Sequence, residues 1–133
     1  MTIGQATVTA GWIWMISGIV LGMLIGLRAE STEWAGGYDS LRRRAMRLAH
    51  ISAIALPLLA ILYGSHIDSL ILATGWKMIG AFLMMGGMML MPIVCLATSV
   101  VNPAKYLFPL PATSILAALV IMAWGQLLTL LGT

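Results

Sequence analysis

The sequence contains 133 residues, of which 61% are hydrophobic and only 8% are charged, and its mean hydropathy is +1.02. Soluble domains carry about a quarter charged residues, so this composition excludes a soluble protein and indicates an integral membrane protein. The formal net charge of +3 does not indicate nucleic acid, because most basic residues lie in one loop beside a predicted span. The lipid bilayer and its anionic head groups are the expected partners there.

The first predicted span covers about residues 8–27. It contains Gly18, Gly22 and Gly26, which repeat every four residues. Small residues at this spacing allow another helix to approach closely. Two uses stay open for this stripe: packing against a helix of the same chain, or docking on another subunit.

The second predicted helix begins at the end of a polar loop. Asp39 and Ser40 are residue types that cap helix N-termini, and an apolar span of about residues 46–63 follows without a break. Pro57 is expected to kink this span, and Ser52 is expected to help satisfy the loosened backbone. Four arginines follow the cap within eight residues, at the foot of this helix: Arg42, Arg43, Arg44 and Arg47.

A short connection is predicted at residues 64–68, followed by a third span at about residues 76–98 and a fourth at about residues 110–131. Each run is close to the length of about 20 residues that crosses a bilayer as a helix. The prediction is therefore an all-α integral membrane protein, a compact bundle of four transmembrane helices in a single domain covering residues 1–133.

The distribution of basic residues predicts the orientation in the membrane. Cytoplasmic loops carry an excess of Lys and Arg, so loops one and three are expected in the cytoplasm and both termini on the non-cytoplasmic side. We expect a bacterial inner membrane. The basic residues of these two loops are Arg28, Arg42, Arg43, Arg44, Arg47 and Lys105.

The spans contain no Asp, Glu or Arg at mid-membrane depth. Proton-coupled carriers need such an intramembrane carboxylate, which argues against a carrier of that kind. The sequence also offers no specific set of nucleophile, base and orienting residue. We therefore do not expect an enzyme.

One candidate cofactor site combines His50 with the sulfur residues of the third span. Met91 and Cys95 belong to a series that also includes Met84 and Met88, at helical spacing. Such a stripe is first of all a packing face. Facing an imidazole, it would also suit copper(I), and a histidine–methionine pair would suit the iron of haem b. His66 is about 24 Å further along the same helix, which excludes a haem held by both histidines.

The four arginines have three possible roles. They can set the topology and touch lipid head groups, dock an acidic partner subunit, or clamp the propionates of a haem or the head group of a bound lipid. The first role requires only charge and position.

The leading functional hypothesis is a non-catalytic accessory or assembly subunit of a larger membrane complex, expected to be an electron-transfer complex, respiratory or photosynthetic. The first alternative is a haem- or copper-handling membrane protein that uses His50, Met91 and Cys95. The second is a small uniporter or channel with a polar path. Its candidate lining residues are Ser17, Ser52, Thr98, Thr113 and Ser114.

Overall fold

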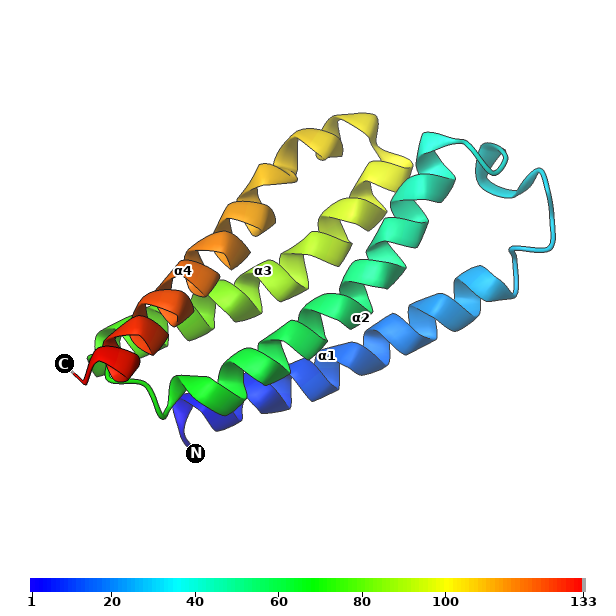
Figure 1. The fold of residues 1–133 in the computed structure, drawn as a ribbon. Coiled ribbons are helices and arrows are strands. Elements are labelled where there is room, and N and C mark those ends of the chain that lie inside the picture. The colour runs from blue at the N-terminus through cyan, green and yellow to red at the C-terminus, as the bar shows by residue number, and fades with distance from the viewer. Residues whose placement is uncertain (133) are drawn as a thin grey trace.

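The structure is a computed structural model that describes residues 1–132, which form four long α-helices and no strand. Each of these four helices has the length and the apolar composition needed to cross a membrane. This confirms the predicted all-α bundle of four membrane-spanning helices (Figure 1). The long helices are α1 (Ile3–Gly26), α2 (Leu41–Ile67), α3 (Thr74–Val100) and α4 (Pro109–Leu131), and two short 3-10 helices are η1 (Trp34–Gly36) and η2 (Asn102–Leu107).

Helix α1 begins five residues before the predicted span because its N-terminus is capped. The Thr2 hydroxyl accepts a hydrogen bond from the Gln5 backbone N–H, and the Gln5 side chain accepts one from the Thr2 backbone N–H. This reciprocal pair satisfies two N–H groups that would otherwise lack partners.

Helix α2 starts as predicted, with Ser40 as its N-cap and the Ser40 hydroxyl accepting a hydrogen bond from the Arg43 N–H at 3.1 Å. Its end differs from the prediction, because residues 64–67 are helical and do not form a connection. Ser65 and His66 both donate to the Leu62 carbonyl, at 2.8 Å each. These polar side chains therefore support the last turn.

Pro57 lies inside α2 and is fully buried. A proline has no N–H, so the Ala53 carbonyl loses its helical partner. The Ser52 hydroxyl does not compensate, because it donates to the Ala49 carbonyl at 3.0 Å. Instead Gly18 of α1 packs directly over the Ala53 carbonyl, a close approach that permits a weak Cα–H···O contact.

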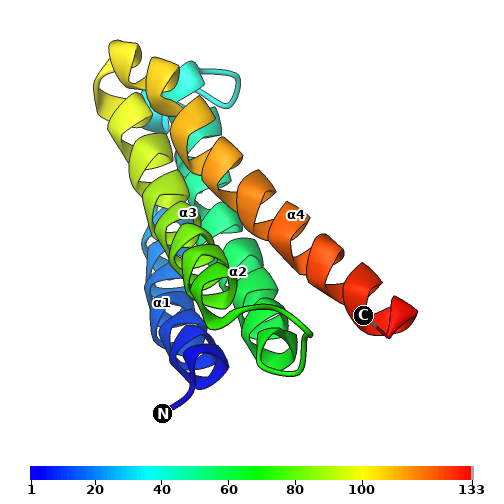
Figure 2. The same cartoon turned by 90° about the vertical axis from the view of Figure 1, so that its left-hand side faces the viewer.

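The helices pack in chain order, α1 on α2, α2 on α3 and α3 on α4, with a smaller contact between α1 and α3. Helices α2 and α3 are therefore the most enclosed, while α1 and α4 are mostly exposed. Figure 2 shows α4 diverging from α2 toward its C-terminal end. The core between α2, α3 and α4 consists of Ala60, Tyr63, Ile67, Leu70, Met84, Met88, Ile115 and Ala118.

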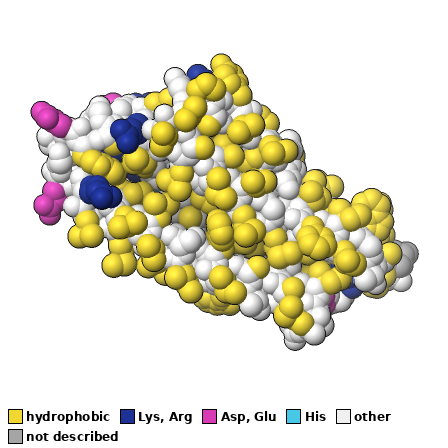
Figure 3. All heavy atoms as spheres, turned by 180° about the vertical axis from the view of Figure 1, so that it is seen from behind, with side chains coloured by type: hydrophobic (Ala, Val, Ile, Leu, Met, Phe, Trp, Pro, Cys, Tyr) yellow, Lys and Arg dark blue, Asp and Glu magenta, His cyan; other side chains and the backbone are white. Residues whose placement is uncertain are grey.

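Both ends of the chain and the α2–α3 loop lie at one end of the bundle, and η1 and η2 lie at the other (Figure 1). On the face drawn in Figure 3, charged side chains gather at the two ends, and the surface between them is largely hydrophobic. This distribution is typical of a protein surrounded by lipid.

Candidate functional site

The glycine stripe of α1 is divided between two environments. A Cβ atom at Gly18 would collide with the Ala53 backbone oxygen, and one at Gly22 would collide with the His50 ring. At Gly26 nothing lies within 4 Å of such an atom. Gly18 and Gly22 therefore serve packing within the chain, and only Gly26 remains open to lipid or to another protein.

Two further glycines continue this packing seam and were not identified from the sequence. Gly4 lies against the Gly64 backbone, and Gly11 lies against Pro57 and Ile61. Gly4, Gly11 and Gly18 are spaced by seven residues, and a seven-residue spacing drifts by only about 20° around a straight helix. This seven-residue spacing is the feature of the sequence from which the packing seam could have been predicted.

His50 belongs to the α1–α2 interface. Its Nδ1–H donates to the Gly18 carbonyl oxygen at 3.0 Å, since a carbonyl can only accept. The ring covers Gly22, whose missing side chain provides the space for it. One ring nitrogen of His50 is thus used to join two helices.

The sulfur residues lie mainly in the core on the other side of α2. Met84, Met88 and Cys95 are fully buried, and Met91 is partly buried. The Cys95 thiol faces the Ser52 hydroxyl of α2. Among residues 1–132 no group of three or more His, Cys, Asp or Glu side chains could hold a metal ion. The His50, Met91 and Cys95 site stays a prediction, since His50 bonds to Gly18 of α1 and the Cys95 thiol faces Ser52.

Arg43 differs from the other arginines because it is 8% exposed. Its guanidinium donates to the Ala29 carbonyl at 3.0 Å and lies over the rings of Trp34 and Tyr38, 5.7 and 5.3 Å from their centroids. A planar cation suits both carbonyl and aromatic partners. Arg43 therefore fastens the loop between α1 and α2 to the start of α2.

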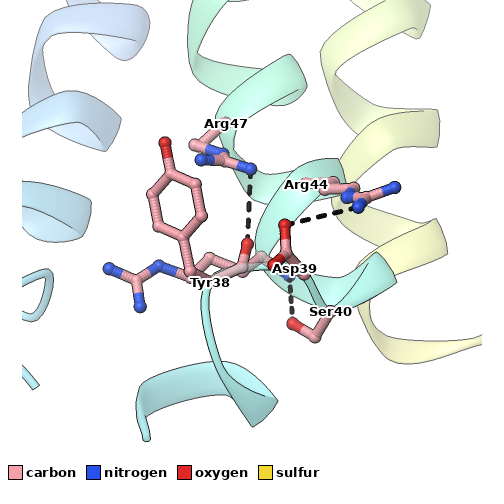
Figure 4. A network of polar contacts seen from close by, with 6 residues as sticks. Tyr38, Asp39, Ser40, Arg44 and Arg47 are labelled. Carbon is pink, nitrogen blue, oxygen red and sulfur yellow. Dashed lines mark hydrogen bonds and ion pairs between the residues drawn. The ribbon is translucent and has the colours of Figure 1, made fainter. Parts of the chain in front are cut away.

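Arg44 and Arg47 also contact this loop (Figure 4). Arg44 lies 3.4 Å from the Asp39 carboxylate, an exposed pair that contributes little to stability. Arg47 donates to the Tyr38 carbonyl at 3.4 Å and stacks over the Tyr38 ring at 4.2 Å. Arg42 is exposed and makes no hydrogen bond or ion pair with a described residue. Arg42 is thus the arginine most available to a lipid head group or partner.

Asp68 joins the start of α1 to the end of α2, a role that the sequence did not reveal. Its carboxylate accepts hydrogen bonds from the Gly4 N–H at 3.1 and 3.2 Å and from the Thr2 hydroxyl. A carboxylate at a helix N-terminus is favoured by the free N–H groups and by the helix dipole. The backbone of Asp68 also accepts a hydrogen bond from Lys77 at 2.8 Å.

The hydroxyl residues considered for a polar path donate to backbone carbonyls. Ser17, Thr98 and Thr113 donate to carbonyls of their own helices at 2.6, 2.8 and 2.8 Å. Ser114 of α4 donates to the Leu83 carbonyl of α3 at 2.8 Å. These hydrogen bonds explain the presence of the hydroxyl groups, and no solute path is needed to explain them.

A groove of about 690 Å³ lies between α1 and α3. Its walls are almost entirely apolar, and it extends along α1 from Ile13 to Leu24. Trp14 lies in the wall, and its buried indole N–H has no acceptor among the described residues. The α3 and α2 residues that line it are Ala53, Pro92, Ile93 and Leu96.

A second groove, of about 280 Å³, lies between α2 and α4. It includes Gln126, which the sequence reasoning did not single out, although it is the one side-chain amide inside the predicted spans.

Comparisons with protein-family models, with curated proteins and with solved structures find no match to this chain.

Proposed function

We propose that this chain is a non-catalytic accessory subunit of a larger membrane complex. Its role is to pack against other membrane subunits and to position them through helix and lipid contacts. The kind of complex that we expect is an electron-transfer complex, respiratory or photosynthetic, a choice that the identity of co-purifying proteins tests directly.

The observation that supports this proposal is the apolar groove between α1 and α3. It follows α1 from Ile13 to Leu24, a length of about 16 Å at 1.5 Å per residue. This is three turns, enough to hold a helix of a partner subunit. Helix α1 offers the surface, because only 11% of its most apolar window is buried within the chain.

One polar group in the groove wall favours a partner helix over an acyl chain. Ser17 lines the groove. Its hydroxyl donates to the Trp14 carbonyl at 2.6 Å and keeps a lone pair that can accept a hydrogen bond. A partner helix can supply a hydroxyl donor at this depth, whereas an acyl chain has none.

The proposed setting is a bacterial inner membrane with both termini on the non-cytoplasmic side. The end that carries η1 and η2 has the basic residues of the two loops, and the opposite end has Lys77. Arg42, exposed at the first of these ends, is positioned for an anionic head group. Reporter fusions at each terminus test the orientation, and a cytoplasmic signal from either fusion would contradict it.

The main experiment measures the native size of the tagged chain in a mild detergent extract of its own host membranes. We expect a particle many times larger than the 14.2 kDa chain. Val20→Trp fills the groove and should release the chain from this particle. Leu116→Trp is the matched control, because Leu116 is 61% exposed on α4 and lies outside the groove. A wild-type chain that migrates alone or as a dimer would disprove the proposal.

A further inference from the structure

The outer face of α2 continues from a positive end into an apolar surface. Residues three and four positions apart share a helix face, and those that follow Arg44 at this spacing are exposed and apolar. Ala53, which packs against Gly18 of α1, is nine residues from Arg44 and therefore points to the opposite side of α2. This outer face is thus turned away from α1. Its apolar residues are Leu48, Ile51, Ala55 and Leu58.

The apolar part of this face has the length of one leaflet. Leu48 and Leu58 are ten residues apart, about 15 Å at 1.5 Å per residue. The hydrocarbon core of a bilayer is about 30 Å thick, so one leaflet contributes about half of that. Arg44 lies one turn before Leu48, at the start of this surface. The face therefore matches the division of a phospholipid into a charged head group and an acyl chain.

The positive end has more arginine charges than carboxylates that contact them. Among the described residues the only ion pair is the one between Arg44 and Asp39, 3.4 Å apart. The buried Arg43 has a carbonyl and two aromatic rings as partners, which are uncharged. Arg42 and Arg47 have no carboxylate partner within residues 1–132, and the two glutamates of the α1–α2 loop pair with none of these arginines. This end of α2 therefore attracts an anion.

Arg44 and Arg47 can bind one phosphate together. They are three residues apart, which makes them neighbours on the helix surface. Each guanidinium has five N–H donors, and Figure 4 shows one contact from each, from Arg44 to Asp39 and from Arg47 to the Tyr38 carbonyl. The exposed pair with Asp39 is weak, so the remaining donors are available. A planar fork of N–H groups matches the geometry of phosphate oxygens.

We propose that this face binds one anionic phospholipid, with its phosphate at Arg44 and Arg47 and an acyl chain along the apolar residues below them. An acidic soluble segment would match only the arginines. A partner helix would need an acidic residue at one exact position, whereas every lipid of the leaflet carries a phosphate at this depth. The unpaired arginine charge favours a lipid of net negative charge. This inference deepens the lipid contacts of the proposed function, but it requires no partner subunit.

The test is titration of the purified full-length chain in detergent micelles with phosphatidylglycerol or with phosphatidylcholine of the same acyl chains, followed by native mass spectrometry. We expect one saturable site that prefers phosphatidylglycerol. Arg44→Gln and Arg47→Gln should each reduce this preference about fivefold, because that is the effect of one arginine on binding to an anionic lipid surface. Lys77→Gln removes the same charge at the opposite end of the bundle and should keep the wild-type preference.

Three outcomes would overturn the proposal. The first is equal affinity of the wild type for the two lipids, and the second is an equal loss of preference in Lys77→Gln and Arg44→Gln. The third is displacement of phosphatidylglycerol by soluble glycerol phosphate at equal concentration, which would assign the arginines to a free anion. The first and third comparisons use the wild-type chain, so they decide the question even if a variant fails to fold. None of them depends on the native size in host membranes, so a failure here is distinguishable from a failure of the accessory-subunit proposal.

Discussion

The glycine seam between α1 and α2 leads to a prediction that compares two alanine substitutions in one helix. Gly18→Ala places a methyl group against the Ala53 backbone oxygen, which cannot move aside without shifting α2. Gly26→Ala places the same group in open space. The substitution is the same in both variants, and both positions belong to α1, Gly18 in its interior and Gly26 as its last residue.

The difference between these variants isolates the packing contribution. Alanine is favoured over glycine in a helix interior by about 1 kcal/mol, a gain that applies at Gly18 and is smaller at Gly26, the last residue of α1. At Gly18 overpacking costs about 1–3 kcal/mol. A shift of α1 would also weaken the bond from His50 to the Gly18 carbonyl, worth about 1 kcal/mol. We expect Gly18→Ala to be less stable than Gly26→Ala by about 1–4 kcal/mol, which is these two costs less a helix-propensity gain of up to about 1 kcal/mol at Gly18.

The assay is reversible unfolding in mixed micelles, followed by helical ellipticity as the fraction of denaturing detergent increases. Gly26→Ala should match or exceed the wild type, and Gly18→Ala should unfold at a lower fraction. Equal stability of the two variants would refute the assignment of Gly18 to an intrachain contact. It would instead leave the stripe available for docking on another subunit.

Three further predictions concern the contacts that connect the helices. Arg43→Lys should lower the free energy of unfolding by about 1–3 kcal/mol and expose residues 28–39 to protease. The control Arg42→Lys should do neither. Similar cleavage of both variants would contradict the role of Arg43 in fastening this loop. Asp68→Ala should cost about 1 kcal/mol and speed amide exchange at Gly4, and unchanged exchange would contradict the cap. His50→Ala should cost about 1–2 kcal/mol through the lost bond to Gly18; a haem absorption band in the purified protein that disappears in this variant would show instead that His50 binds a cofactor.

The helices were predictable because their physical signals are strong and local. Four apolar runs of span length, and a capping residue before the arginines, were sufficient. The end of α2 was harder to predict, because Ser65 and His66 are polar in the way of loop residues. They lie in the last turn of α2, and their side chains bond to the Leu62 carbonyl.

The candidate site residues were harder to assign because sequence gives the depth of a residue but not the direction that it faces. His50 and Cys95 were predicted at similar depth, yet the ring of His50 packs on α1 and the Cys95 thiol faces Ser52. A step of four residues turns about 40° beyond a full circle. Gly26 is therefore about 80° from Gly18 around α1 and leaves the interface with α2.

The four arginines show the same limitation. Neighbouring residues of a helix differ by about 100° in direction, so a cluster of equal charges divides among different surroundings. Arg43 turns toward the loop and is buried, whereas Arg42 turns away and is exposed. Sequence reasoning treated them as one group because nothing in their order distinguishes the direction that each side chain faces.

The most direct test of the proposed function is photo-crosslinking in the host membrane from a reactive residue placed at Val20, in the groove between α1 and α3. The same residue at Leu116, on the outer surface of α4, is the control. We predict a discrete protein adduct from Val20 that is absent from Leu116 and that identifies the partner subunit. Lipid adducts alone from both positions would contradict the proposal that another subunit occupies this groove.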